Sequence, residues 1–232
     1  MPDMRNYLRY IHPLGTAHWS QRSIADAIQA VNTTSPQAIC LELDKRRFDH
    51  LRRACFECPR FGHCKRKCEF VAAADALGNQ EADIWLIDMD ERDITRRVQS
   101  QATLEEIVAW QRIDAYVTKH NEQGIRLWEE GLKQEALAHF NGGTELMRRT
   151  FPTLWQVLIQ ERNLVMAARL IFITEQYLQS AIIEPNILTL VGAAHVQGIR
   201  ELLTDPATLA RSIEQRRIEF TPPARIHRVK VL

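Results

Sequence analysis

The sequence predicts an α/β protein with a central, mainly parallel sheet and an inserted helical lobe that covers a site at the strand ends. Short and nearly continuous apolar runs, typical of buried parallel strands, lie at about residues 8–14, 36–43, 83–89 and 186–193. A helical pattern separates the third run from the fourth, over about residues 103–180. Gly-x-x-His closes both the first run and the last. We expect one domain over residues 1–232.

The first half of the chain reads as a strand, a helix and two further strands. The first strand is followed by the motif Gly15-Thr16-Ala17-His18. A helix is expected from Ser20 to Val31, because its apolar residues fall on one face, and the Asn-Thr-Thr-Ser-Pro sequence after it ends the helix. Strand, helix and strand at this length predict a right-handed parallel crossover. The second and third strands centre on Ile39 and Leu86.

The second half begins with the helical lobe. Two amphipathic stripes precede a stop signal at residues 141–143, and Phe151-Pro152 opens a longer helical region. The last strand then empties into Gly192-Ala193-Ala194-His195. We expect helices at about residues 198–203 and 206–216. Alternation in the basic tail, residues 225–232, predicts an edge strand.

Composition describes an ordinary globular domain and sets few limits on function. The chain has 232 residues, of which 45% are hydrophobic and 25% charged, with a formal net charge of +1. This balance gives no global attraction to nucleic acid or to a membrane surface. No apolar stretch reaches the roughly 18 residues of a spanning helix, and the amino terminus lacks a signal-peptide core. We therefore expect a cytoplasmic protein without a membrane partner, whose cysteines are thiols or metal ligands.

His18, Glu42 and His195 form the first candidate site. In open α/β sheets, ligand sites gather at the carboxyl ends of strands, so two such strands, paired or near each other, could bring both imidazoles to one crevice. Glu42 ends an apolar strand, where a carboxylate is costly unless it is paired or metal-bound. Two imidazoles and one carboxylate are a common ligand set for a divalent metal. The alternative is that the histidines are cap or core residues and that Glu42 pairs with Arg46 or Arg47.

Four charged residues near the strand ends are candidates for supporting roles. Arg47 lies about one helical turn past the second strand, Asp88 ends the third strand, and Glu161 and Arg162 lie in the long helix. An arginine in such a site would hold a carboxylate or a developing oxyanion in its planar fork. The alternative is a solvated charged face.

The Cys-rich insert, residues 54–70, is a separate candidate metal site. Its ligands would be Cys55, Cys58, Cys64 and Cys68, spaced C-x2-C-x5-C-x3-C. Thiolates select zinc or an iron–sulfur cluster, here [4Fe-4S], and a zinc knuckle that uses His63 in place of Cys64 competes with both. Free thiols or an adventitious disulfide are the remaining alternative. The lysines and arginines of the insert could also contact single-stranded nucleic acid, although such a basic knob is more often a solvated face.

In their order and spacing, these motifs resemble the TraB/PrgY/GumN family across about residues 8–204. The resemblance rests on both Gly-x-x-His motifs, on Glu42 with Arg47, on Leu86-Ile87-Asp88, and on Glu161-Arg162 with Met166-Ala167. The family is related to the Tiki proteases and, more distantly, to erythromycin-esterase-like and ChaN-like proteins. The resemblance implies a metal-dependent peptidase whose site maps onto His18, Glu42 and His195, with Arg47, Asp88, Glu161 and Arg162 in support. The Cys-rich insert is not part of the family pattern.

Three functions are compatible with the sequence. The first is a metal-dependent hydrolase that cleaves a peptide or amide bond, its divalent metal held by His18, Glu42 and His195. The second is a metal-free esterase-like hydrolase, in which one histidine is the general base and Glu42 orients it. The third is a non-catalytic protein that binds haem or another cofactor, or nucleic acid through the Cys-rich insert. The expected partner is a peptide or small-molecule substrate; nucleic acid is not favoured, and a homodimer is a further expectation.

Overall fold

The computed structural model describes residues 6–18, 20–56, 68–78, 80–180, 182 and 184–226, without the side chains of residues 52, 54–56 and 114. The elements, in chain order, are η1 (Tyr7–Arg9), β1 (Ile11–Thr16), α1 (Gln21–Thr34), β2 (Ala38–Leu41), α2 (Lys45–Phe56), α3 (Glu69–Ala76), β3 (Asp83–Leu86), α4 (Glu91–Gln101), α5 (Leu104–Arg112), α6 (Asp114–Glu129), α7 (Lys133–Thr150), α8 (Pro152–Trp155), the π-helical η2 (Gln156–Glu161), α9 (Arg162–Gln179), β4 (Ile187–Gly192), α10 (Ala193–Thr204), α11 (Pro206–Gln215) and β5 (Ala224–Ile226).

The described strands form one sheet in the order β1-β4-β2-β3-β5. The first four are parallel to their neighbours, and β5 runs antiparallel to β3 at the edge. The predicted α/β class with a mainly parallel sheet is therefore confirmed. The first strand begins at Ile11 rather than near residue 8, because a 3-10 turn, capped by Asn6, occupies the preceding residues. Of the predicted edge strand in the tail, residues after 226 lie outside the described part.

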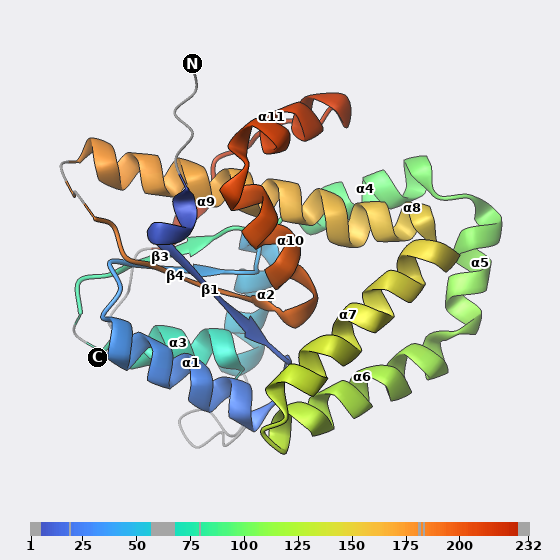
Figure 1. The fold of residues 1–232 in the computed structure, drawn as a ribbon, viewed down its shortest axis with the longest axis horizontal. Coiled ribbons are helices and arrows are strands. Elements are labelled where there is room, and N and C mark those ends of the chain that lie inside the picture. The colour runs from blue at the N-terminus through green and yellow to red at the C-terminus, as the bar shows by residue number, and fades with distance from the viewer. Residues whose placement is uncertain are drawn as a thin grey trace.

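Helices cover both faces of the sheet, which gives three layers (Figure 1). Side chains alternate between the faces along each strand, as the period of two requires. Ile39 and Leu41 of β2 pack with α1 and α3, whereas Cys40 points to the layer of α9 and α10. In β4, Leu188 and Leu190 face the first layer. Both faces of the parallel strands are thus buried, which explains why each strand reads as a continuous apolar run.

The predicted lobe, residues 103–180, contains two kinds of helix. Helices α5, α6 and α7 project beyond one end of the sheet (Figure 1), whereas α9 packs on the sheet with Leu164, Met166 and Leu170 in the main core. The projecting helices are tied back to α1 by Glu129 of α6. Its carboxylate accepts hydrogen bonds from two backbone amides at the amino terminus of α1, at 2.5 and 3.2 Å.

Helix α10 begins earlier than the sequence predicts. It starts at Ala193, directly after β4, rather than near residue 198. Gly192 provides the extended N-cap backbone, so the second Gly-x-x-His motif crosses the strand–helix junction and His195 lies in the first turn of the helix. The structure also adds α4, capped by the side chain of Asp90, where no element is predicted.

Candidate active site at the carboxyl ends of three neighbouring strands

The two Gly-x-x-His motifs lie side by side because their strands are direct neighbours. Strands β1 and β4 pair in parallel, with Gly15 opposite Val191 and Thr16 opposite Gly192. Strand β2, which leads to Glu42, flanks β4 on its other side. His18, His195 and Glu42 therefore leave three adjacent strands at the same edge of the sheet.

Glu42 is the centre of the cluster. Its side chain is only 5% exposed. One carboxylate oxygen, Oε2, accepts a hydrogen bond from the backbone amide of Gly192 at 2.5 Å, and the other, Oε1, accepts one from Arg162 Nη2. His195 Nε2 lies 3.4 Å from Oε1. Burial raises the pKa of Glu42, but its electrostatic interactions with His195, Arg162 and His18 lower the pKa by more, so the net shift is downward and the carboxylate is ionised at neutral pH.

His195 is held through the ring nitrogen that points away from Glu42. The ring is buried, and its Nδ1 lies 2.6 Å from Asn163 Oδ1 of α9. A carbonyl oxygen can only accept, so Nδ1 carries the proton. Burial lowers the pKa of His195, which favours the neutral ring. In that tautomer Nε2 presents a lone pair towards Glu42.

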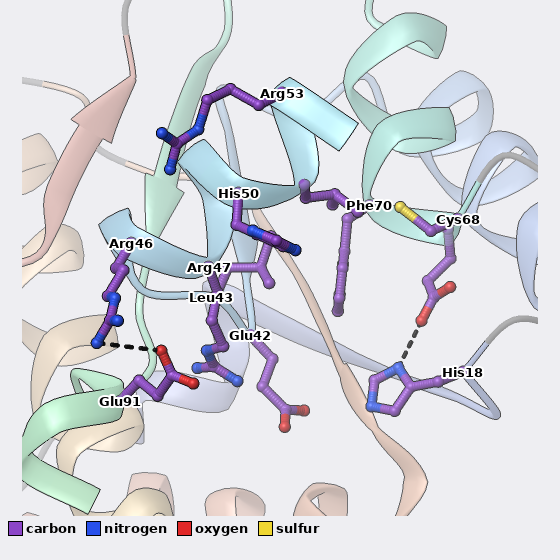
Figure 2. A pocket seen from close by; sticks show the side chains of 12 residues that line it. His18, Glu42, Leu43, Arg46, Arg47, His50, Arg53, Cys68, Phe70 and Glu91 are labelled. Carbon is purple, nitrogen blue, oxygen red and sulfur yellow. Dashed lines mark hydrogen bonds and ion pairs between the residues drawn. The ribbon is translucent and has the colours of Figure 1, made fainter. Parts of the chain in front are cut away.

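His18 is held in the same way by a different helix. Its Nδ1 lies 2.6 Å from Oε1 of Glu69, the first residue of α3 (Figure 2). Glu69 is buried and also accepts a hydrogen bond from Thr16 Oγ1. Partial burial lowers the pKa of His18. The hydrogen bond to Glu69 and the charges of Glu42 and Glu69 raise this pKa by a larger amount, so the net shift is upward. The Nε2 atom of His18 is left facing Gly192 and Glu42.

Both motif glycines are required by close approach. A Cβ atom on Gly192 would lie 2.9 Å from His18 Nε2 and 3.4 Å from Glu42 Oε2. A Cβ atom on Gly15 would lie 2.9 Å from a side-chain methyl of Val196 on α10. Gly192 thus makes room for His18 of the first motif, and Gly15 makes room for Val196 on the helix that carries the second motif. Gly15 lies within β1 and Gly192 is the last residue of β4, so at both positions the glycine is needed for close packing.

A ladder of alternating charges supports Glu42 from behind. Arg162 donates to Asp88 through Nε at 3.0 Å and Nη2 at 2.6 Å, and Arg47 donates to Asp88 and to Asp44. Asp88 is fully buried. Burial raises the pKa of Asp88, but the two guanidinium groups lower it by more and hold it well below its ordinary value. The structure therefore brings together Arg47, Asp88 and Arg162 as well as the first three residues.

Glu161 points elsewhere. Its buried carboxylate accepts two hydrogen bonds from Arg97 of α4, from Nε at 2.5 Å and from Nη2 at 3.0 Å. Arg97 also donates to the backbone oxygen of Arg216 after α11. Glu161 thus joins three helical segments and makes none of its described contacts with His18, His195 or Glu42. Its supporting role at the site remains a prediction, and its visible role is structural.

Three residues of the site environment were missed by the sequence analysis. Glu69 and Asn163 hold the imidazoles, and Arg169 donates to the backbone oxygen of Asp88. Asn163 and Arg169 are polar residues in the largely apolar sequence of α9. A polar residue in such a run is expected to have a buried partner, and this pattern could have identified both. Glu69 follows Cys68 and offered no comparable signal.

A cavity of about 550 Å³ opens beside this cluster (Figure 2). It is lined by His18, Glu42, Leu43, Arg46, Arg47, His50, Leu51, Arg53, Cys68, Glu69, Phe70 and Glu91. Helix α2 forms one wall, and the start of α3 forms the opposite one. The cavity is large enough for part of a peptide or for a small molecule.

The Cys-rich insert lies mostly outside the described residues. This applies to Cys58, His63 and Cys64 and to the side chain of Cys55. Cys68 is described: it is buried, and its Sγ caps α3 by accepting from Val71 N. Zinc, [4Fe-4S] and nucleic-acid binding at the insert thus stay predictions. In the described part of the chain, no group of three or more His, Cys, Asp or Glu side chains is already arranged around a metal position.

Comparison with known proteins supports the family suggested by these motifs. The TraB/PrgY/gumN family model matches residues 87–208, more than half of the chain. An uncharacterised protein of Methanocaldococcus jannaschii is 24% identical over 220 residues, which cover 82% of this chain and 52% of the relative. The chain thus spans about half the length of that curated relative, and no solved structure matches it. Among the described helices, none combines the length and apolar character that crossing a membrane requires. The chain belongs to the TraB/PrgY/gumN family.

Proposed function

We propose that this protein is a hydrolase that cleaves a peptide or amide bond in the cavity beside Glu42. The observation that carries the proposal is the matched orientation of His18 and His195. Each imidazole is held at Nδ1 by an acceptor from another helix, and each turns Nε2 towards the same buried carboxylate. The lone pair on Nε2 of neutral His195 and the ionised carboxylate of Glu42 repel each other unless a proton, a water molecule or a cation lies between them.

The chemistry of this donor set suits a divalent cation, although in the described structure the three side chains are not arranged around one metal position. Metal-binding histidines commonly donate the other ring N–H to a carboxylate or carbonyl, as His18 does to Glu69 and His195 to Asn163. The ligands would be the two Nε2 atoms and Glu42. When bound there, the cation would polarise the scissile carbonyl and acidify a water molecule. Because Glu42 also pairs with Arg162, its carboxylate would be shared between the cation and the guanidinium.

The remaining residues would keep the reacting groups in place. Arg162 and Gly192 N–H fix both oxygens of Glu42, so the carboxylate cannot rotate freely. Asp88 holds Arg162 in turn, and Arg47 supports Asp88 at the edge of the cavity. Such preorganised dipoles and charges stabilise a transition state without having to rearrange during the reaction.

A metal-free hydrolase is the second candidate, and it is favoured by the neutral state of the His195 ring. Burial keeps this ring neutral, so Nε2 can accept a proton from an attacking water or hydroxyl. Glu42, ionised and 3.4 Å away, would stabilise the imidazolium that results. The two candidates differ in one respect: whether the Nε2 lone pair of His195 serves as a metal ligand or as a base.

One experiment tests the proposal and separates the candidates. Purified protein is assayed for release of new amino groups from pooled random hexapeptides, with His18→Ala, His195→Ala and Glu42→Gln as variants. His12→Ala, an exposed histidine on β1, is the matched control. We expect each site variant to lose at least about 100-fold in rate and the control to keep its rate. Activity at the wild-type rate in both site histidine variants would contradict the proposal.

Chelation then distinguishes the two mechanisms. If a metal is required, a chelator abolishes activity, an added divalent cation restores it, and the metal content of His18→Ala and His195→Ala falls below that of the wild type. If His195 is a base, the chelator leaves the rate unchanged. Comparing metal content with the wild type also removes any contribution from the Cys-rich insert, which all variants share.

A further inference from the structure

Helix α2 presents a row of basic side chains to the cavity. Arg46, His50 and Arg53 all line it, and their spacing of four and three residues places them on one face of the helix. All three side chains are exposed. Because α2 starts three residues after Glu42, the row extends from the reaction centre outwards for about 10 Å, at 1.5 Å per residue.

The charges at the inner end of the cavity are already compensated within the protein. Glu42 pairs with Arg162, Glu69 with His18, and Arg47 with two buried aspartates. These side chains already neutralise one another, so none of them offers an unpaired charge to a charged group of the substrate. Recognition of charge on a ligand therefore depends on the outer part of the cavity.

The outer basic residues are only weakly engaged by the protein. Arg46 lies 3.6 Å from Glu91, and both side chains are more than half exposed, so this ion pair contributes little. Arg53 donates from Nε to the backbone oxygen of Asp49 at 3.3 Å. That contact leaves the terminal amino groups of Arg53 for another acceptor, in a geometry that matches a carboxylate.

We infer that the α2 face formed by Arg46, His50 and Arg53, which extends over about two helical turns, binds a carboxylate of the substrate. This inference rests on the proposed function and specifies its substrate class: acidic peptides, or amides that carry a carboxylate. Glu91 competes for Arg46, so the substrate carboxylate must displace it from a weak, exposed ion pair.

The test compares two hexapeptide pools that are identical except for one position, fixed as Glu in one pool and as Gln in the other, and scanned along the peptide. Hydrolysis is measured with the wild type, Arg53→Gln, the double variant Arg46→Gln/Arg53→Gln, and Arg126→Gln as an exposed control from α6 that does not line the cavity. Binding is measured separately, as the ratio of Glu to Gln peptides retained by immobilised His195→Ala protein with and without the Arg53→Gln change.

We expect the wild type and the control to prefer Glu peptides by about fivefold or more at one or two positions, and the double variant to lose that preference. Raising the salt concentration should reduce the preference in the wild type. The inference would be overturned if Glu and Gln peptides were hydrolysed at equal rates and retained in equal amounts, or if neither pool were bound. Hydrolysis of both pools without preference leaves the proposed function standing while the inference fails. A binding preference that needs Arg53, without hydrolysis of either pool, supports the anion site and contradicts the proposed function.

Discussion

Replacing Arg162 with methionine should destabilise the protein strongly, because this side chain holds two buried carboxylates. Arg162 is 14% exposed, whereas Asp88 and Glu42 are 0% and 5% exposed. Methionine keeps the apolar stem and removes the charge. Asp88 would keep Arg47 and the Met89 amide as partners, and Glu42 would keep the Gly192 amide.

The magnitude follows from the bonds that are lost. Breaking a buried ion pair by removing one partner costs about 3–5 kcal/mol, since the remaining charge is left without compensation. A domain of this kind has a total stability of about 5–15 kcal/mol. Arg162→Met should therefore lose a large fraction of the free energy of unfolding but remain measurable by urea denaturation. Arg92→Met, at an exposed position on α4, should stay within about 0.5 kcal/mol of the wild type.

The effect should also depend on pH in a defined direction. The pKa values of Asp88 and Glu42 are lowered in the folded protein from ordinary values of 3.8 and 4.5. Groups of this kind add stability above their unfolded pKa, and that stability is lost as the pH falls through the folded pKa. The difference between the wild type and Arg162→Met should be largest at pH 6–7 and should shrink below about pH 4.

The assay is urea unfolding followed by tryptophan fluorescence, at several pH values between 3 and 7 and with a chelator present so that only the chain's own groups contribute. A loss below about 1 kcal/mol at pH 7 would refute the reasoning, as would a difference that stays constant on acidification. Either result would mean that Asp88 and Glu42 find other compensation when Arg162 is removed.

Two further substitutions separate site geometry from general stability. Gly192→Ala would place a methyl group 2.9 Å from His18 Nε2. We expect at least about a tenfold loss of hydrolysis, measured by kinetics, and a stability cost of about 1–3 kcal/mol, measured by urea unfolding. Unchanged kinetics would show that the position of the imidazole is not critical. Glu161→Gln should weaken the contact with Arg97 and lower the free energy of unfolding by about 1–3 kcal/mol. The rate of hydrolysis per folded molecule should stay within about threefold of the wild type. A large loss of rate at unchanged stability would instead place Glu161 in the reaction.

The sequence was sufficient for the sheet because its strands are buried on both faces. The parallel strands read as continuous apolar runs, and the Gly-x-x-His motifs at the end of two of them mark the carboxyl ends. Strand order was less accessible. Apolar runs carry no record of their neighbours, so the insertion of β4 between β1 and β2 could be anticipated only from the repeated motif.

Side chains that act through a second residue were harder to predict. Glu161 and Arg162 are adjacent in sequence, but neighbours on a helix point in different directions, and only Arg162 reaches the site. The π-helical turn that ends at Glu161 adds to this difficulty, because it changes the register in which side chains face the sheet. Nothing in the local pattern of the pair indicates which of the two points to Glu42.

The partners of the two imidazoles explain why the site depends on the whole fold. His18 is oriented from α3 and His195 from α9, and these helices cover opposite faces of the sheet. A change that loosens either layer would free one imidazole while the other stays in place. In the proposed reaction both rings point Nε2 at Glu42 at the same time, and this geometry exists only while both layers are docked. Activity should therefore be lost on partial unfolding of either helix, before the sheet itself opens.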